Sequence, residues 1–132
     1  MTECIFKLLS RNGTIIIEVQ YLLNTLKDLT FDNIYHEHYN YWSLTSLINF
    51  FNHYDAAIYR AEKINTHGGS IRVYLKKGKK IKIENSVKKL ILEEDKFGIK
   101  KYETYKEFAK KVYKIRDNVR KNILKLNAFS FK

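Results

Sequence analysis

The chain has 132 residues, of which 45% are hydrophobic and 14% are aromatic. This length allows one small domain, and this composition excludes a disordered chain. The sequence has no apolar run approaching about 18 residues and no signal-peptide pattern after Met1, so we expect neither a transmembrane helix nor secretion. A single cysteine, Cys4, cannot form an internal disulfide. We therefore expect a cytoplasmic protein.

The net charge of +11 comes from the second half of the chain. Residues 1–66 hold five basic and seven acidic side chains, a balance of −2, whereas residues 67–132 hold twenty and seven, a balance of +13. The basic residues are mostly Lys, and Arg is the side chain best suited to paired contacts with phosphates and bases. We therefore expect no nucleic-acid partner.

The first half of the chain predicts a helix, a strand and a second helix. Residues 4–9 are typical of the last turns of a helix. Residues 14–19 are almost all β-branched, which predicts a strand buried on both faces, as in a parallel sheet. Residues 20–41 show no clean period, so we expect an irregular functional segment. Ser43 is placed to cap a helix whose apolar residues recur at three- and four-residue spacing.

The second half predicts a hairpin and then helices. Residues 56–64 and 70–75 are joined by a short loop with two glycines, which is typical of an antiparallel hairpin. Residues 81–84 could add a short edge strand. Helices are expected over residues 86–94 and from Tyr102 onward. The second of these has a heptad-like apolar stripe made by Tyr105, Phe108, Val112, Ile115, Val119 and Leu126.

Three segments carry distinctive residue patterns. Residues 31–44 have the sequence FDNIYHEHYNYWSL, residues 66–74 have THGGSIRVY, and residues 8–19 have LLSRNGTIIIEV. In composition, order and spacing they resemble the sugar C-methyltransferases, which use S-adenosyl-L-methionine (SAM) to methylate nucleotide-linked keto-sugars. Trp42 replaces the Phe usual in that family, and Gln20 replaces the usual Pro.

The resemblance implies an α/β fold, namely part of a Rossmann-like class I methyltransferase sheet. Its fifth strand and an antiparallel C-terminal hairpin would be followed by helices. Residues 1–84 would be the C-terminal part of the methyltransferase domain, and residues 85–132 a helical segment leading to a C-terminal domain. The family's glycine-rich donor loop and its acidic partner precede the fifth strand and have no counterpart in this sequence. The resemblance therefore implies a fragment, inactive alone, that lacks most of the SAM site and that a second polypeptide or self-association could complete.

The resemblance assigns the catalytic base to His38, with Tyr35 and Glu37 assisting it. A carbonyl acidifies the neighbouring C–H of a keto-sugar, and an imidazole with a pKa near neutrality suits the removal of that proton. Glu37 could orient the imidazole, and the Tyr35 hydroxyl could bind the developing oxyanion. A surface loop with unrelated histidines is the alternative.

The second motif supplies the predicted substrate-binding residues, which are His67, Gly68, Gly69, Ser70 and Arg72. The two glycines could form a backbone nest for the diphosphate of a sugar nucleotide, or simply a turn that requires positive φ. Arg72 could contact a phosphate or be an exposed edge charge.

Two further alternatives concern metals and binding. His36 and His38 could join His53 or His67 on zinc, but their spacing does not favour it, so we expect no metal. Glu18, at the end of the first strand, could contact a ligand or cap the following loop. A free-standing basic module that binds a sugar nucleotide or another anionic partner is the alternative to a methyltransferase fragment; neither function involves a membrane.

Overall fold

The computed structural model describes residues 2–36, 38–66, 68–78 and 80–130, with side chains as far as residue 126. Contacts divide the chain into two compact units, residues 1–99 and residues 100–132. The first unit is a mixed α/β structure and the second is helical. The α/β class predicted from the sequence is confirmed, whereas the division into family domains at residue 84 stays a prediction.

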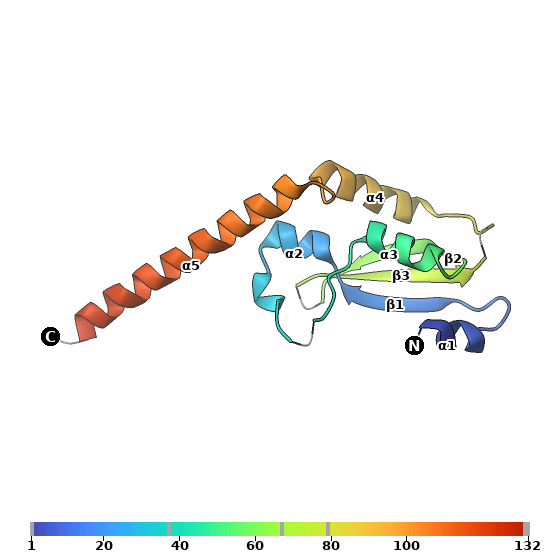
Figure 1. Cartoon of the computed structure of the whole chain (residues 1–132), viewed down its shortest axis with the longest axis horizontal. Coiled ribbons are helices and arrows are strands. Elements are labelled where there is room, and N and C mark those ends of the chain that lie inside the picture. The colour runs from blue at the N-terminus through green and yellow to red at the C-terminus, as the bar shows by residue number, and fades with distance from the viewer. Residues whose placement is uncertain (1, 37, 67, 79, 131–132) are drawn as a thin grey trace. The chain divides into compact units, whose positions relative to one another are not determined.

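A three-stranded antiparallel sheet organises the first unit (Figure 1). Its strands are β1 (Ile15–Gln20), β2 (Ala56–Ile64) and β3 (Ser70–Lys77), and their order in the sheet is β1-β3-β2. β3 is therefore the central strand, paired on one side with β1 and on the other with β2. The predicted first strand and the predicted hairpin are both confirmed.

The two faces of the sheet differ in polarity. Side chains alternate along a strand, and on β3 the apolar Ile71, Val73 and Leu75 are fully buried. Two helices, α3 (Leu44–Asn52) and α4 (Asn85–Phe97), contact β2 and each other. The core thus lies between these helices and one face of the sheet, whereas the alternate β3 positions carry polar side chains on the other face.

β1 differs from its prediction as a strand buried on both faces. Its burial alternates, and the side chain of Ile16 is 58% exposed. The reason is the polar second face of the sheet, because Ile16 lies opposite Tyr74 in the antiparallel register and Glu18 lies opposite Arg72. The other face of β1 borders α3 and the short helix α1 (Thr2–Leu8) around an apolar pocket.

The segment predicted to be irregular contains two helical elements. They are α2 (Leu22–Asp28) and the 3₁₀-helix η1 (Phe31–Asn33). The usual sequence signals for the start and end of a helix are missing at α2. At its start, the Tyr21 side chain makes no capping hydrogen bond. At its end, Leu29 rather than a glycine takes the left-handed conformation. Burial of one face, rather than capping, fixes this helix.

The predicted edge strand at residues 81–84 is wrong. These residues belong to no strand. The amide of Glu84 donates a hydrogen bond of 2.9 Å to the backbone oxygen of Tyr59 on β2. They lead directly into α4. The helix ends as predicted near Gly98, which has a φ of 79°.

The capping of α3 is also confirmed. The hydroxyl of Ser43 accepts a hydrogen bond from the amide of Ser46 at 3.0 Å, and the Ser46 hydroxyl accepts one from the amide of Ser43 at 3.0 Å. This reciprocal capping box fixes where the chain leaves the segment that contains His38 and enters the helix.

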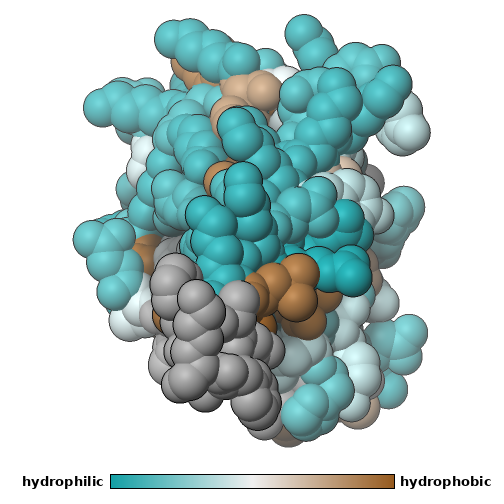
Figure 2. Space-filling view, turned by 90° about the vertical axis from the view of Figure 1, so that its left-hand side faces the viewer, coloured by the Kyte–Doolittle hydropathy of each residue, from teal (hydrophilic) through white to brown (hydrophobic). Residues whose placement is uncertain are grey.

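The second unit contains one long helix, α5 (Tyr102–Ser130). Part of its predicted apolar stripe is half-buried, whereas Val119 and Leu126 are 52% and 67% exposed. Hydrophilic residues make up most of the molecular face in Figure 2, with small hydrophobic areas between them. Among the residues described, no helix has the length and apolar character needed to cross a membrane.

Candidate functional site

A pocket of about 470 Å³ lies at the C-terminal end of β1. It brings together one residue from each predicted site, His38 from the catalytic set and Ser70 from the substrate-binding set. Most of its lining is polar or aromatic: Glu18, Val19, Gln20, His38, Tyr39, Asn40, Trp42 and Ser70. Hydroxyl, amide and carboxylate groups beside a Trp ring are suited to binding a polar molecule such as a sugar.

His38 is held by contacts from its own loop. Its Nδ1 lies 2.7 Å from the backbone oxygen of Asn33, and its ring centroid lies 4.6 Å from that of Tyr35. The predicted pair Tyr35 and His38 is therefore in contact, although Tyr35 is 44% exposed and is not part of the pocket lining. Glu37, the third predicted catalytic residue, lies outside the described residues.

Tyr41 is part of the same cluster. Its hydroxyl donates a hydrogen bond of 2.7 Å to the oxygen of Asn33 that His38 also contacts. Loss of solvation raises the pKa of Tyr41 above its ordinary value, and the neighbouring Tyr35 adds a smaller increase. Tyr41 therefore keeps its proton at neutral pH and remains a donor.

The glycine turn packs against this loop. Gly68 and Gly69 have φ values of 78° and 106°, which favour glycine. A Cβ atom on Gly68 would lie 2.8 Å from the side-chain nitrogen of Asn33, and one on Gly69 would overlap the amide of Asn24. Conformation and close approach therefore both require glycine here.

The backbone of the turn is partly engaged. The amide of Gly69 donates to Thr66 O at 2.8 Å, and its carbonyl accepts from the amide of Tyr21 at 3.1 Å. These bonds support the interpretation as a structural turn, since that amide is already used. A role in binding substrate stays a prediction for Gly68, Gly69 and Ser70, and His67 lies outside the described residues.

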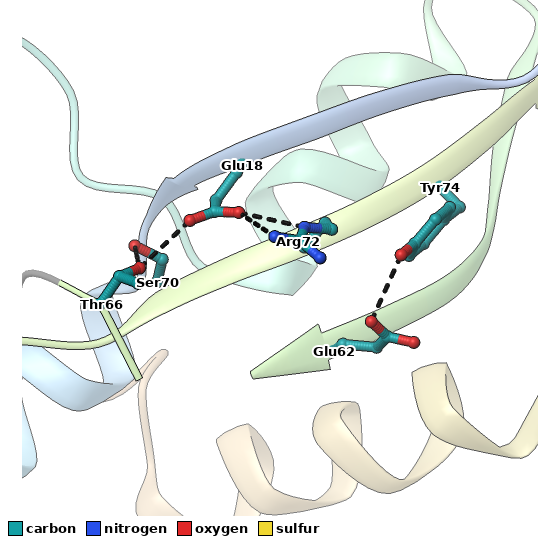
Figure 3. A network of polar contacts seen from close by, with 6 residues as sticks. All are labelled: Glu18, Glu62, Thr66, Ser70, Arg72 and Tyr74. Atoms are coloured by element: carbon teal, nitrogen blue, oxygen red, sulfur yellow. Dashed lines mark hydrogen bonds and ion pairs between the residues drawn. The ribbon is translucent and has the colours of Figure 1, made fainter. Parts of the chain in front are cut away.

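Arg72 forms a paired ionic contact with Glu18 across β3 and β1 (Figure 3). Its Nε and one terminal nitrogen donate to the same carboxylate oxygen at 3.0 and 2.7 Å. The Thr66 hydroxyl donates to the other oxygen at 3.1 Å. Arg72 lies on β3, the central strand, so the expectation that it is a charge at the sheet edge is wrong. Glu18 links it to the pocket.

A second carboxylate cluster was missed at the level of sequence. Glu94 on α4 is fully buried, and it accepts hydrogen bonds from the Tyr21 hydroxyl at 2.9 Å and from the backbone amides of Leu44 and Thr45 at 2.5 and 3.0 Å. The Thr45 hydroxyl adds a fourth at 2.6 Å. A carboxylate at the first turn of α3 satisfies amides that have no partner within the helix.

Sequence reasoning also missed the residues that surround His38. Asn33 and Tyr41 lie within the motif that contains His38, but no pattern of residue types predicts a shared backbone oxygen. Gln20 and Trp42 were noted as departures from the family pattern, and both line the pocket. Among the residues described, no three His, Cys, Asp or Glu side chains form a group that could hold a metal ion.

Comparison with known proteins identifies the family. Residues 65–130 match the model of the C-methyltransferase C-terminal domain, which is half of the chain. The chain is also 34% identical over 114 residues to the C-methyltransferase NovU of Streptomyces niveus, an alignment that covers 86% of this chain and 27% of that protein. The chain thus spans about a quarter of the length of this relative. On these matches, and on the motifs gathered around the pocket, the chain belongs to the C-methyltransferase family.

Proposed function

We propose that the chain carries the base-bearing part of a SAM-dependent C-methyltransferase that acts on a nucleotide-linked keto-sugar. The observation that carries this proposal is the pocket at the end of β1, because His38 and Ser70, from two motifs separated in sequence, both line it. The similarity to a C-methyltransferase supports the reaction class.

The chemistry assigned to His38 is the removal of a proton. A methyl group can be transferred to carbon only if that carbon is nucleophilic. The carbonyl of a keto-sugar acidifies the neighbouring C–H, so an unprotonated imidazole can take the proton. The C–H electron pair then forms a C=C bond and the carbonyl π pair moves onto oxygen, which gives an enolate. The enolate carbon is then the atom that accepts the methyl group. Positioned bases of this kind contribute roughly 10²–10⁴-fold to a rate.

The remaining pocket residues are proposed to orient the sugar. Glu18, Gln20, Asn40 and Ser70 offer hydrogen-bonding groups to sugar hydroxyls, and Trp42 offers an aromatic face. Arg72 contacts Glu18 on the pocket wall and is proposed to hold that carboxylate in place. We assign Tyr35, Glu37, His67 and the turn at Gly68 and Gly69 to supporting roles around the base and the substrate.

The residues present do not fit a site for the methyl donor. The sequence has no glycine between Gly13 and Gly68, and β1, which ends at Gln20, is followed by the buried Tyr21 and the helix α2 instead of a glycine-rich loop. We therefore propose that the SAM site is formed by polypeptide other than these residues and that this chain alone does not complete methyl transfer. A cytoplasmic location is proposed as well, in keeping with the single Cys4.

The proposal can be tested without a methyl donor. The chain is incubated in D₂O with a nucleotide-linked 4-keto-sugar, and loss of the proton signals next to the carbonyl is followed by NMR. Enolate formation by His38 is expected to replace those protons with deuterium faster than buffer does. His38→Ala should lower the enzymatic exchange rate by about 10²-fold or more.

His53→Ala is the matched control, because His53 is exposed beyond the end of α3 and does not line the pocket. It should exchange protons at the wild-type rate. Exchange at the buffer rate by the folded wild-type chain, or equal exchange by wild type and His38→Ala, would contradict the proposal.

A further inference from the structure

We propose that Asn33 is the positioning residue for His38, and that it makes Nε2 the ring nitrogen that takes the substrate proton. This inference rests on the proposed function in one respect, the role of His38 as the base. It goes beyond that function by naming the reacting atom and the residue that selects it.

The first step concerns the position of the imidazole hydrogen. Nδ1 of His38 lies 2.7 Å from the backbone oxygen of Asn33. A carbonyl oxygen can accept a hydrogen bond but cannot donate one, so Nδ1 must carry the hydrogen in this contact. In a neutral imidazole the other nitrogen then has the lone pair. Nε2 is consequently the nitrogen that can act as a base.

The second step concerns what holds the carbonyl of Asn33. Asn33 is the last residue of η1, and the amide of Ile34 closes that turn by donating to Phe31 O at 3.0 Å. The Tyr41 hydroxyl donates to the same Asn33 oxygen as His38. The amide of His38 donates to Tyr35 O at 3.0 Å, and the His38 ring centroid lies 4.6 Å from that of Tyr35. The Asn33 oxygen is therefore held by two contacts besides that with His38, from the Tyr35 amide at 3.1 Å and from the Tyr41 hydroxyl, and the imidazole also contacts the Tyr35 ring.

The third step connects the base to the glycine turn. The side chain of Asn33 lies so close to Gly68 that a Cβ atom there would come within 2.8 Å of its nitrogen. The Cβ and Cγ2 atoms of Thr30 lie 3.7 and 3.6 Å from the same point, which is ordinary van der Waals contact, so Asn33 is the neighbour that a Cβ atom would displace. A change in the turn should thus be transmitted through Asn33 to the His38 ring.

The direct test is ¹⁵N NMR of the histidine side chains in the full chain. The His38 signals are assigned by their loss in His38→Gln. At a pH where the ring is neutral, we expect a protonated, pyrrole-type Nδ1 and an unprotonated, pyridine-type Nε2. A neutral His38 with the hydrogen on Nε2 would overturn the inference.

The coupling is tested with two glycine substitutions. Gly68→Ala should push Asn33 and lower the Nδ1–H to Nε2–H ratio roughly three- to tenfold, as expected for weakening one hydrogen bond. Gly78→Ala is the matched control, because Gly78 also has a positive φ, 111°, but a Cβ atom there meets nothing within 4 Å. It should leave the ratio unchanged. Equal ratios in wild type and Gly68→Ala would overturn the role of the turn.

A second measurement covers the case in which Gly68→Ala does not fold. The side-chain nitrogen of an Asn at position 38 lies near the place of Nδ1, whereas that of a Gln lies near the place of Nε2. His38→Asn should therefore keep the bond to Asn33 and unfold at higher urea concentration than His38→Gln, and the reverse order would contradict the inference. Both variants lack the base, so this result is independent of proton exchange. If His38 proves to be the base but carries its hydrogen on Nε2, the proposed function stands and this inference fails.

Discussion

Glu94 and Glu18 are two carboxylates that each collect hydrogen bonds from distant parts of the chain, but in opposite surroundings. Glu94 is fully buried and accepts from Tyr21 and from the first turn of α3. The Glu18 side chain is 34% exposed, contacts Arg72 and Thr66, and lines the pocket. The first joins three elements inside the core, whereas the second joins two strands at a surface that a ligand can reach.

This difference indicates how the molecule separates stability from function. A buried carboxylate leaves its donors unsatisfied when it is altered, so its loss should be costly. An exposed ion pair contributes little to stability because water replaces either partner. Glu94 should therefore matter for folding, and Glu18 for the pocket.

The largest expected effect comes from Glu94→Gln. The amide keeps one acceptor oxygen but places an NH₂ group against donors at the start of α3, so we expect the free energy of unfolding to fall by about 3 kcal/mol. Urea denaturation followed by circular dichroism measures this change.

Glu93→Gln is the matched control for this variant. Glu93 neighbours Glu94 in sequence but is partly exposed, with Lys27 at 2.5 Å and Lys63 at 2.6 Å. Hydrogen bonds from these lysines lower the pKa of Glu93, so its small contribution, under about 1 kcal/mol, is present at neutral pH and lost as the pH falls below the ordinary carboxyl value. If Glu93→Gln lowered the free energy of unfolding as much as Glu94→Gln, the distinction between buried and exposed carboxylates would be wrong.

The next effect concerns Tyr21→Phe, which removes one of the four donors to Glu94. We expect the free energy of unfolding to fall by about 2 kcal/mol at neutral pH, which is in the range for a hydrogen bond to a charged group. Burial, and then the neighbouring Glu94, raises the pKa of Tyr21 above its ordinary value of 10.0. The protonated form is thus favoured by folding, and its contribution is complete below pH 10 and lost as the pH rises above it. Unfolding curves at several alkaline pH values should show a shallower loss in Tyr21→Phe, and parallel losses would contradict this role.

The sequence predicted those parts of the fold that depend on local signals. The β-branched run of β1, the glycine loop of the hairpin and the Ser43 cap each lie within a few residues of the element they specify. The helix α2 has no such signal, since Tyr21 and Leu29 flank it where a capping side chain and a glycine would be usual. Tertiary burial determined it instead.

The candidate site shows the same division. The motifs identified His38 and Ser70 as site residues, and the structure places both at one pocket. The bond from His38 to Asn33 and the cluster around Glu94 could not be predicted, because one uses a backbone oxygen and the other joins residues 50 and 73 positions apart. Side-chain type carries no information about either.

The smallest effect on stability is expected for Glu18→Gln, and it is the most informative about the pocket. Because the pair with Arg72 is partly exposed, the free energy of unfolding should change by less than about 1 kcal/mol. If Glu18 binds a sugar hydroxyl as proposed, the Kd for a nucleotide-linked keto-sugar should rise about tenfold, the effect of losing one charge-assisted hydrogen bond. Isothermal titration calorimetry measures this change.

Glu62→Gln is the control, since Glu62 pairs with Arg60 and accepts a hydrogen bond from Tyr74 on the same sheet but does not line the pocket. A loss of affinity shared by both variants would point to the charge of the whole face, whereas a Glu18→Gln variant as unstable as Glu94→Gln would make Glu18 a structural residue.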